Sequence, residues 1–150
     1  MTYGQRRYPK ARKLLILADS GGANGYRNRM WKYKLHELLC NRCNLELVIA
    51  HYPSGASKWN PIEHRLFCEI SKNWRGVPLK TFETVLNYIK TTKTKTGLTV
   101  KSQLVIKKYK KGMKVLKEDF AKINIKQKRV LPKWNYSLHK GEKSCQIFSS

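Results

Sequence analysis

Residues 14–29, LLILADSGGANGYRNR, decide the fold of this chain. The continuous apolar run over residues 14–18 has strand length and predicts a fully buried β-strand. Asp19 ends the run, and the composition of residues 20–25 predicts a loop. Apolar residues then recur at helical spacing over about residues 26–39. The stretch therefore predicts a strand, a glycine-rich turn and a helix, with one carboxylate at the end of the strand.

A second strand is expected over residues 45–51, LELVIAH. Strand, helix and strand in this order predict a parallel crossover unit. A loop rich in Pro, Gly and Ser follows over residues 52–59, and Asn60 and Pro61 are typical of a helix cap and first helical position. The apolar spacing extends that helix to about residue 73.

The second half of the chain carries weaker patterns. They predict a helix over residues 79–91, a strand over 98–106, a basic turn over 109–114, a short helix over 117–123, a packed tail over 131–137 and a loose end after residue 140.

Charge is the strongest global property of the sequence, with 32 Lys and Arg against nine Asp and Glu and a net charge of +23. Such a charge attracts polyanions, and nucleic acid is the expected partner. A generally basic proteome or a ribosomal type of structural role would also explain it. Lys107, Lys108, Lys110 and Lys111 form either a solvated face or one that faces DNA. No apolar run approaches a membrane span and no signal-type segment is present, so a cytoplasmic location is expected.

Cysteine spacing leaves two interpretations open. Cys40 and Cys43 form a C-x-x-C pair, whereas Cys68 and Cys145 stand alone. A zinc site needs further ligands at suitable spacing, and no second pair exists. Structural thiols are therefore favoured over zinc or redox chemistry.

Asp19 and Glu63 are the candidate catalytic and metal-binding residues. Ligands of parallel sheets lie at the carboxyl ends of the strands, where Asp19 is expected, and Glu63 lies in the first turn of the helix that follows the second strand. Two carboxylates suit Mg²⁺, and paired ions promote in-line phosphoryl displacement. Two alternatives stay open: Asp19 can cap its own turn, and Glu63 can form a capping box with Asn60, favoured by the helix dipole.

Basic and aromatic residues near these acids have possible roles in DNA binding. Arg27 and Arg29 can bind phosphate beside the helix N-terminus. Lys58 and His64 can reach a phosphate or a leaving group, or can be plain surface residues. Trp59 and Trp74 are interpreted as packing anchors, with base stacking as the alternative.

Two long motifs carry a family resemblance. Residues 18–32 (ADSGGANGYRNRMWK) and 51–67 (HYPSGASKWNPIEHRLF) resemble the DDE domain of the Rhodopirellula-type insertion-sequence transposases. The resemblance continues at 73–79 (NWRGVPL), 92–98 (TKTKTGL) and 134–136 (WNY). It extends from about residue 8 to 138.

The resemblance implies an RNase H-like α/β fold and metal-dependent DNA strand cleavage and transfer with Mg²⁺ or Mn²⁺. Asp19 matches the family's second acid, on its fourth strand, and Glu63 matches the third, on the helix after the fifth strand. The first acid has no counterpart. The expectation is therefore a C-terminal portion: a basic lead-in (1–13), the last two strands and flanking helices of the catalytic domain (14–78), a basic α+β extension (79–138) and a flexible tail (139–150).

An incomplete set of acids has consequences for activity and partners. Two acids are expected to hold the metal weakly, so the chain alone is expected to be inactive. The expected partners are the DNA of the element ends and target, an upstream transposase half and further copies of the chain, near the bacterial nucleoid. The alternative is a non-catalytic basic module that binds DNA or RNA.

Overall fold

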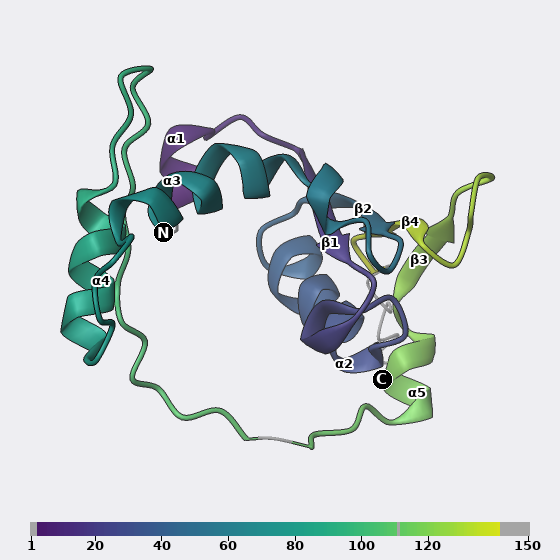
Figure 1. Cartoon of the computed structure of the whole chain (residues 1–150). Coiled ribbons are helices and arrows are strands. Elements are labelled where there is room, and N and C mark those ends of the chain that lie inside the picture. The colour runs from purple at the N-terminus through teal and green to yellow at the C-terminus, as the bar shows by residue number, and fades with distance from the viewer. Residues whose placement is uncertain (1–2, 111, 142–150) are drawn as a thin grey trace, which may run out of the picture. The chain divides into compact units, whose positions relative to one another are not determined.

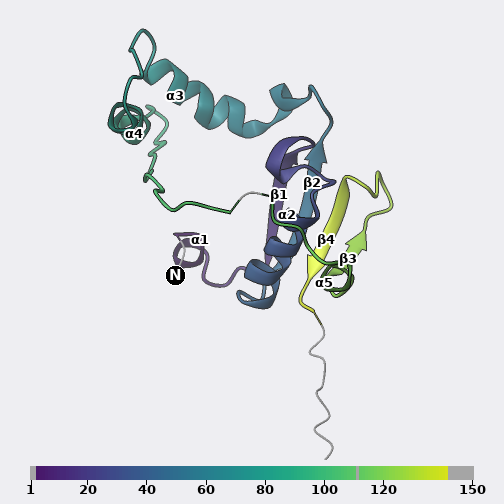
Figure 2. The ribbon, with the colours of Figure 1, turned by 90° about the horizontal axis from the view of Figure 1, so that it is seen from below.

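The computed structural model of the chain describes residues 3–110 and 112–141. It forms two compact units (Figures 1 and 2), one made of Met1–Ser54 with Gly112–Ser150 and the other of Gly55–Lys111. No helix in the described part of the chain is long and apolar enough to cross a membrane.

A four-stranded mixed sheet, in the order β1-β2-β4-β3, forms the centre of the first unit. β1 (Lys13–Asp19) runs parallel to β2 (Glu46–Tyr52), which confirms the predicted crossover unit. β4 (Asn135–His139) pairs antiparallel with β2, and β3 (Asn124–Gln127) pairs antiparallel with β4. The β1–β2 register sets Asp19 opposite Tyr52, so both strands end at the same edge of the sheet.

The crossover helix begins three residues later than the apolar spacing predicts. α2 spans Arg29–Leu35 and is capped by Asn28, whose Oδ1 accepts a hydrogen bond of 3.1 Å from the Trp31 backbone N–H. Its last turns widen into a π-helical segment, η2 (His36–Asn41). Because the Asn28 side chain satisfies a free N–H of the first turn, the helix starts there and Tyr26 stays in the turn.

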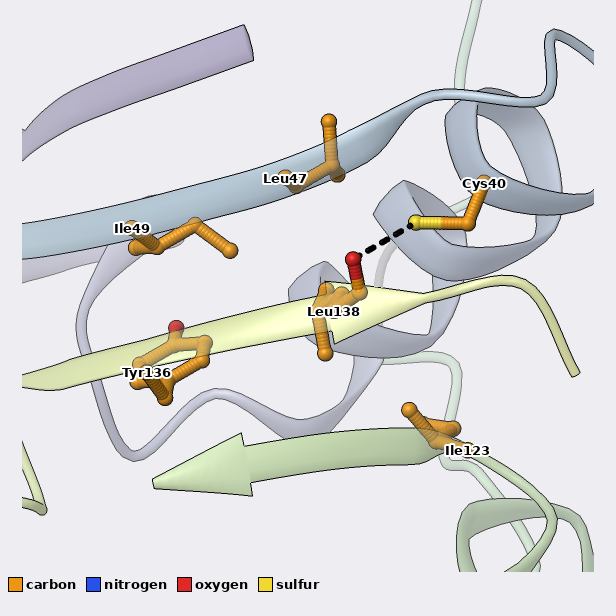
Figure 3. Close-up of a cluster of buried hydrophobic side chains, with 6 residues drawn as sticks. All are labelled: Cys40, Leu47, Ile49, Ile123, Tyr136 and Leu138. Carbon is orange, nitrogen blue, oxygen red and sulfur yellow. Dashed lines mark hydrogen bonds between the residues drawn. The ribbon is translucent and has the colours of Figure 1, made fainter. Parts of the chain in front are cut away.

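The core of the first unit lies between the sheet and this helix. Figure 3 shows Leu47 and Ile49 of β2 beside Tyr136 and Leu138 of β4, all fully buried, with Cys40 of η2 against them. The Cys40 thiol donates to the Leu138 carbonyl oxygen at 3.5 Å. Burying a Leu or Ile side chain stabilises a fold by about 1.5 to 3 kcal/mol, so this cluster holds α2 and η2 on the sheet.

β1 is not the fully buried strand that its apolar run predicts. Leu14, Leu15 and Leu17 are 40%, 60% and 41% exposed, and Ala18 is its one buried residue. β1 is an edge strand, so half of its backbone hydrogen-bonding groups have no strand beside them. Leu15 and Leu17 also alternate with the core-facing residues and point to the opposite face of the sheet.

The C-terminal segment is part of the same sheet. The packed tail predicted over residues 131–137 is confirmed at Tyr136 and Ser137, which are buried, but not at Leu131, which is 60% exposed. The prediction did not foresee that β4 begins at Asn135 and lies in the sheet between β2 and β3. β3 was not predicted at all. The short helix predicted over residues 117–123 is confirmed as α5 (Lys117–Ala121). A chain segment distant in sequence thus completes the core around β2.

The second unit is helical in its described part. The helix predicted over residues 60–73 is confirmed, with a short 3-10 turn η3 (Ser57–Trp59) before it, a π-helical turn η4 (Glu63–Phe67) and then α3 (Cys68–Asn73). The helix predicted over residues 79–91 is confirmed as α4 (Phe82–Thr91), capped by Thr81. The Asn73 side-chain amide donates to the Tyr88 carbonyl oxygen at 2.6 Å and ties α3 to α4.

The strand predicted over residues 98–106 is wrong. Thr99 forms one isolated bridge with Lys93, and residues 100–110 are irregular. Val105 and Ile106 are 57% and 88% exposed, so these apolar side chains have no surface to pack on. The basic lead-in contains one element that was not predicted, the short helix α1 (Tyr3–Arg7). Residues 142–150 of the predicted tail, with Cys145, lie outside the described residues.

Candidate functional site at the carboxyl end of the sheet

Asp19 is the last residue of β1 and is exposed. Eight of the nine acids are described, and four of them (Glu37, Glu46, Glu69 and Asp119) lie within 3.5 Å of a His or Lys nitrogen. Glu63, Glu83 and Glu118 lie in the first turn of a helix. Asp19 has neither kind of stabilisation. A carboxylate left unpaired among so many cations is available for a ligand.

In the described residues, neither acid forms the capping hydrogen bond that would explain it structurally. The Asp19 side chain makes no hydrogen bond to its own turn, and only its backbone carbonyl oxygen accepts one, from His51 at 3.1 Å. At the second helix, the Asn60 Oδ1 accepts from the Ile62 N–H at 3.4 Å, but Glu63 returns no side-chain bond to Asn60. The capping-box explanation of Glu63 is therefore wrong, and its first-turn position remains favourable for the helix dipole.

His51 fixes the backbone under Asp19, a role that the sequence analysis missed. It is 5% exposed, and its ring nitrogens lie 3.1 Å from the Asp19 carbonyl oxygen and 3.0 Å from the Tyr136 hydroxyl. Burial lowers the pKa of His51, with the Asp19 carbonyl opposing this effect and Lys32 adding to it. The neutral ring therefore donates to Asp19 through Nδ1 and accepts from Tyr136 through Nε2.

An aromatic cluster surrounds this histidine. The His51 ring stacks on Tyr136 with centroids 5.7 Å apart, and Trp31 and Tyr26 meet it edge-on at 5.5 and 6.2 Å. Tyr26 also contacts Trp134 at 5.9 Å. Burial raises the pKa of the Tyr136 hydroxyl, which therefore stays a neutral donor. The cluster gives the end of β1 a rigid, low-dielectric support.

The glycine-rich turn after Asp19 needs two of its glycines. Gly22 has a φ of +67°, in the region that favours glycine. A Cβ on buried Gly25 would lie 2.8 Å from the Ser20 carbonyl oxygen. The Asn28 amide closes the turn by donating to the Ala23 carbonyl oxygen at 2.6 Å. The turn is thus tightly folded directly beyond the carboxylate.

A hollow of about 500 Å³ opens beyond this turn, lined by Ser20, Gly21, Gly22 and Gly25 together with Arg27 and Ser54. The Ser20 and Ser54 hydroxyls lie 3.2 Å apart and join the loops that follow β1 and β2. The Arg27 Nε donates to the Tyr26 hydroxyl at 2.9 Å, and its guanidinium lies over the Tyr26 ring. The hollow therefore combines hydroxyls, exposed backbone and one cation next to Asp19.

Glu63 belongs to the second unit, where it is half-buried at the start of η4. The His64 Nε2 contacts the Lys58 carbonyl oxygen, and the Lys58 ammonium lies 5.2 Å from the centre of the Trp59 ring. The π-helical geometry widens the backbone at Glu63, a feature frequent at functional sites. Trp59 is 69% exposed, so its interpretation as a packing anchor is wrong, whereas Trp74 is half-buried.

The remaining candidates divide by exposure. Lys107, Lys108 and Lys110 are exposed and lie in a segment without regular secondary structure, and Lys111 lies outside the described residues. Arg29 is exposed, and its guanidinium lies 5.4 Å from the centre of the Phe120 ring.

Cys40 is buried and its pKa is raised to about 11 by burial, while the Cys43 thiol donates to the Leu38 carbonyl oxygen. These contacts fit structural thiols.

A metal would find only part of a ligand set here. No group of three His, Cys, Asp or Glu side chains within the described ranges could hold an ion. Asp19 and Glu63 each carry oxygen ligands of the hard kind that Mg²⁺ prefers, and neither forms an ion pair with a described cation.

The class of protein defined by these features is an α/β protein with a mixed sheet and an unpaired carboxylate at the carboxyl end of a strand. The family model of the Rhodopirellula transposase DDE domain matches residues 1–140, and the chain belongs to this family. Comparison with curated proteins and with solved structures finds no match. DDE transposase domains generally use divalent metal ions. Membership of a transposase family indicates DNA as the binding partner.

Proposed function

We propose that this chain supplies the second and third acids, Asp19 and Glu63, of a metal-dependent site for DNA strand cleavage and transfer. The observation that carries the proposal is the unpaired Asp19 carboxylate, at the end of a strand held in place by His51. Family membership over residues 1–140 supports the assignment of both acids. The fold proposed is the part of an RNase H-like domain that contains its last two parallel strands.

Mg²⁺ or Mn²⁺ is the proposed cofactor. Bound divalent ions activate the attacking oxygen and stabilise the leaving oxygen of an in-line phosphoryl transfer. Asp19 and Glu63 would hold the metal, while Arg27 beside Asp19 and Lys58 and His64 beside Glu63 would bind the phosphates. With two acids in place of three, the proposed metal affinity is low.

The first acid is proposed to come from a strand outside these 150 residues, supplied by an upstream transposase half. The free edge of β1 supports this proposal, because Leu14, Leu15 and Leu17 are 40 to 60% exposed beside unpaired backbone groups. A strand added there would cover the edge and bring its own carboxylate to the end of β1. The chain alone is therefore proposed to be inactive.

The test is a strand-cleavage assay on element-end DNA with Mg²⁺ or Mn²⁺. The purified chain should give no cleavage, and mixing it with the upstream half should restore cleavage. Asp19→Asn and Glu63→Gln should each abolish the restored activity, whereas the matched variant Glu118→Gln, in the first turn of α5, should keep it. Metal-dependent cleavage by the chain alone, abolished by Asp19→Ala, would contradict the incomplete site. Full activity of both acid variants would contradict their role.

A second candidate is a non-catalytic basic module that holds DNA or RNA. It is favoured by the exposed Lys107, Lys108 and Lys110, which form no ion pair with any described carboxylate. In this case alanine at these lysines and at Lys111 weakens nucleic-acid binding, and Asp19→Asn and Glu63→Gln change neither binding nor any metal response. The two candidates thus differ in the requirement for the acids.

A further inference from the structure

A second hollow in the first unit gathers four cations that are not paired with any described carboxylate. It has a volume of about 240 Å³ and lies between the start of α2, α5 and the β3–β4 loop. Arg27, Arg29 and Lys32 line it from the turn and helix, and Lys133 lines it from the loop. No described carboxylate forms an ion pair with any of the four. Four uncompensated cations around one small hollow call for an anionic ligand.

Aromatic rings hold three of these cations in place. The Arg27 and Arg29 guanidiniums lie 5.2 and 5.4 Å from the centres of the Tyr26 and Phe120 rings, and the Lys32 ammonium lies 4.5 Å from the centre of the Tyr136 ring. A guanidinium held over a ring keeps most of its N–H groups free for a phosphate. The cations are therefore ordered before any ligand binds, which lowers the entropic cost of binding.

Lys32 is the most constrained member of the group. It is half-buried, and burial lowers its pKa. Holding a partly desolvated ammonium charged without a counter-ion costs free energy, which a bound anion would remove. Lys32 is also close enough to His51 to lower the pKa of that histidine, so the hollow and the support of Asp19 share one set of side chains.

Apolar side chains complete the walls and limit what the hollow admits. Phe120, Ile125 and Pro132 line it together with the cations. Its volume is below the usual range of about 300 to 1,000 Å³ for sites of drug-sized ligands. A DNA duplex is far too wide to enter, whereas one sugar or base with its phosphate suits a hollow with both charged and apolar walls.

We propose that this hollow binds one nucleotide of an unpaired DNA strand, with its phosphate on Arg29, Lys32 and Lys133 and its sugar or base against Phe120 and Pro132. The proposal rests on the proposed DNA-strand chemistry of the chain and adds a site for the strand beside it. The phosphate can be an internal phosphodiester or a terminal phosphomonoester, because both present the same oxygen acceptors.

The experiment measures binding by fluorescence anisotropy with the full chain in EDTA, so metal binding and cleavage play no part. The probes are a labelled single-stranded tetranucleotide with a 5′-phosphate, the same strand without it, and a duplex long enough to be stable. Inorganic phosphate serves as competitor. The pocket variant is Lys32→Met with Lys133→Ala, and the matched control removes two exposed charges elsewhere, Lys34→Ala with Lys95→Ala.

The pocket variant should weaken single-strand binding by about tenfold or more, because it removes two charge-assisted contacts, while the control weakens it by about two- to threefold or less. Duplex binding should respond equally to both variants. A tighter complex with the 5′-phosphorylated strand assigns the site to strand ends, and equal affinity assigns it to internal phosphates. Lys133→Glu alone, at an exposed position, repeats the test if Lys32→Met unfolds the chain.

Equal losses of single-strand affinity in the pocket and control variants would overturn the proposal. So would an equally large loss of duplex affinity in the pocket variant. A failure of the proposed catalytic function leaves this measurement unchanged, since it would appear only in the metal-dependent assays of Asp19→Asn and Glu63→Gln.

Discussion

His51 is the residue on which the geometry of Asp19 depends. It joins three strands, because it lies on β2, contacts the Asp19 backbone on β1 and contacts Tyr136 on β4. His51→Ala leaves the Tyr136 hydroxyl unpaired and opens a cavity, and we expect a loss of about 2 to 4 kcal/mol in the free energy of unfolding. Urea denaturation measures it. Tyr136→Phe is the matched control and should cost about 1 kcal/mol; equal costs would contradict the bridging role.

The same histidine predicts a pH dependence of stability. Burial lowers the pKa of His51 in the folded state below its ordinary value of 6.5, so the unfolded chain binds the proton first. The stabilisation is therefore complete above pH 6.5 and is lost as the pH falls through the folded pKa. Denaturation midpoints between pH 7.5 and 5 should decline in the native chain and decline less in His51→Gln. An unchanged pH profile in that variant would contradict a neutral, buried His51.

Gly25 is the second residue that decides the shape of the site. A methyl group there would meet the Ser20 carbonyl oxygen at 2.8 Å, whereas the space around Gly21 is open. Gly25→Ala should therefore lower the free energy of unfolding by about 1 to 3 kcal/mol, and Gly21→Ala should change it by less than about 1 kcal/mol. Thermal unfolding of the two variants checks this difference. Similar effects at both positions would show that the turn after Asp19 is not tightly packed.

At the scale of elements, β1 is the strand most open to a partner. Leu15 is 60% exposed, so Leu15→Lys should leave the thermal midpoint nearly unchanged and should raise solubility, because a charge on an edge strand opposes strand addition. It should also weaken pairing with the upstream half. Leu47→Lys, which buries a charge in the core, should prevent folding. Unfolding by Leu15→Lys to the same extent would contradict an open edge.

Local patterns predicted the elements whose stabilising contacts are close in sequence. The β1, α2 and β2 unit and the helices over residues 61–73 and 82–91 follow from apolar spacing and caps. β4 did not follow, because five residues carry little periodicity and its partner β2 is distant in the chain. The apolar run over residues 14–18 indicated burial wrongly, since period alone does not separate an edge strand from a central one.

The positions of the candidate site residues could be predicted only where local patterns determine them. The sequence placed Asp19 at the end of a strand and Glu63 in the first turn of the next helix, and the structure has both residues at these positions. His51 was missed because its role depends on Tyr136, 85 residues further along the chain. Lys32 and Lys133 were missed for the same reason, since only the folded sheet brings α2 and the β3–β4 loop to one hollow.

At the scale of the whole molecule, the charge of +23 should dominate the affinity for duplex DNA. Each lysine that neutralises a phosphate contributes about 0.9 to the slope of log K against log salt concentration. Alanine at Lys107, Lys108, Lys110 and Lys111 should reduce that slope by up to about 3.6. Filter binding at salt concentrations from about 50 to about 300 mM measures this slope. An unchanged slope would exclude this lysine cluster from the DNA contact.

The central proposal is that Asp19 and Glu63 belong to the same metal site. Paramagnetic broadening of amide signals by substoichiometric Mn²⁺ tests it most directly, because broadening falls steeply with distance from the ion. The account predicts that signals next to Asp19 and next to Glu63 broaden first, and that Asp19→Asn abolishes both effects while Glu118→Gln preserves them. Broadening at Glu63 that survives Asp19→Asn, or broadening that begins at other acids, would contradict it.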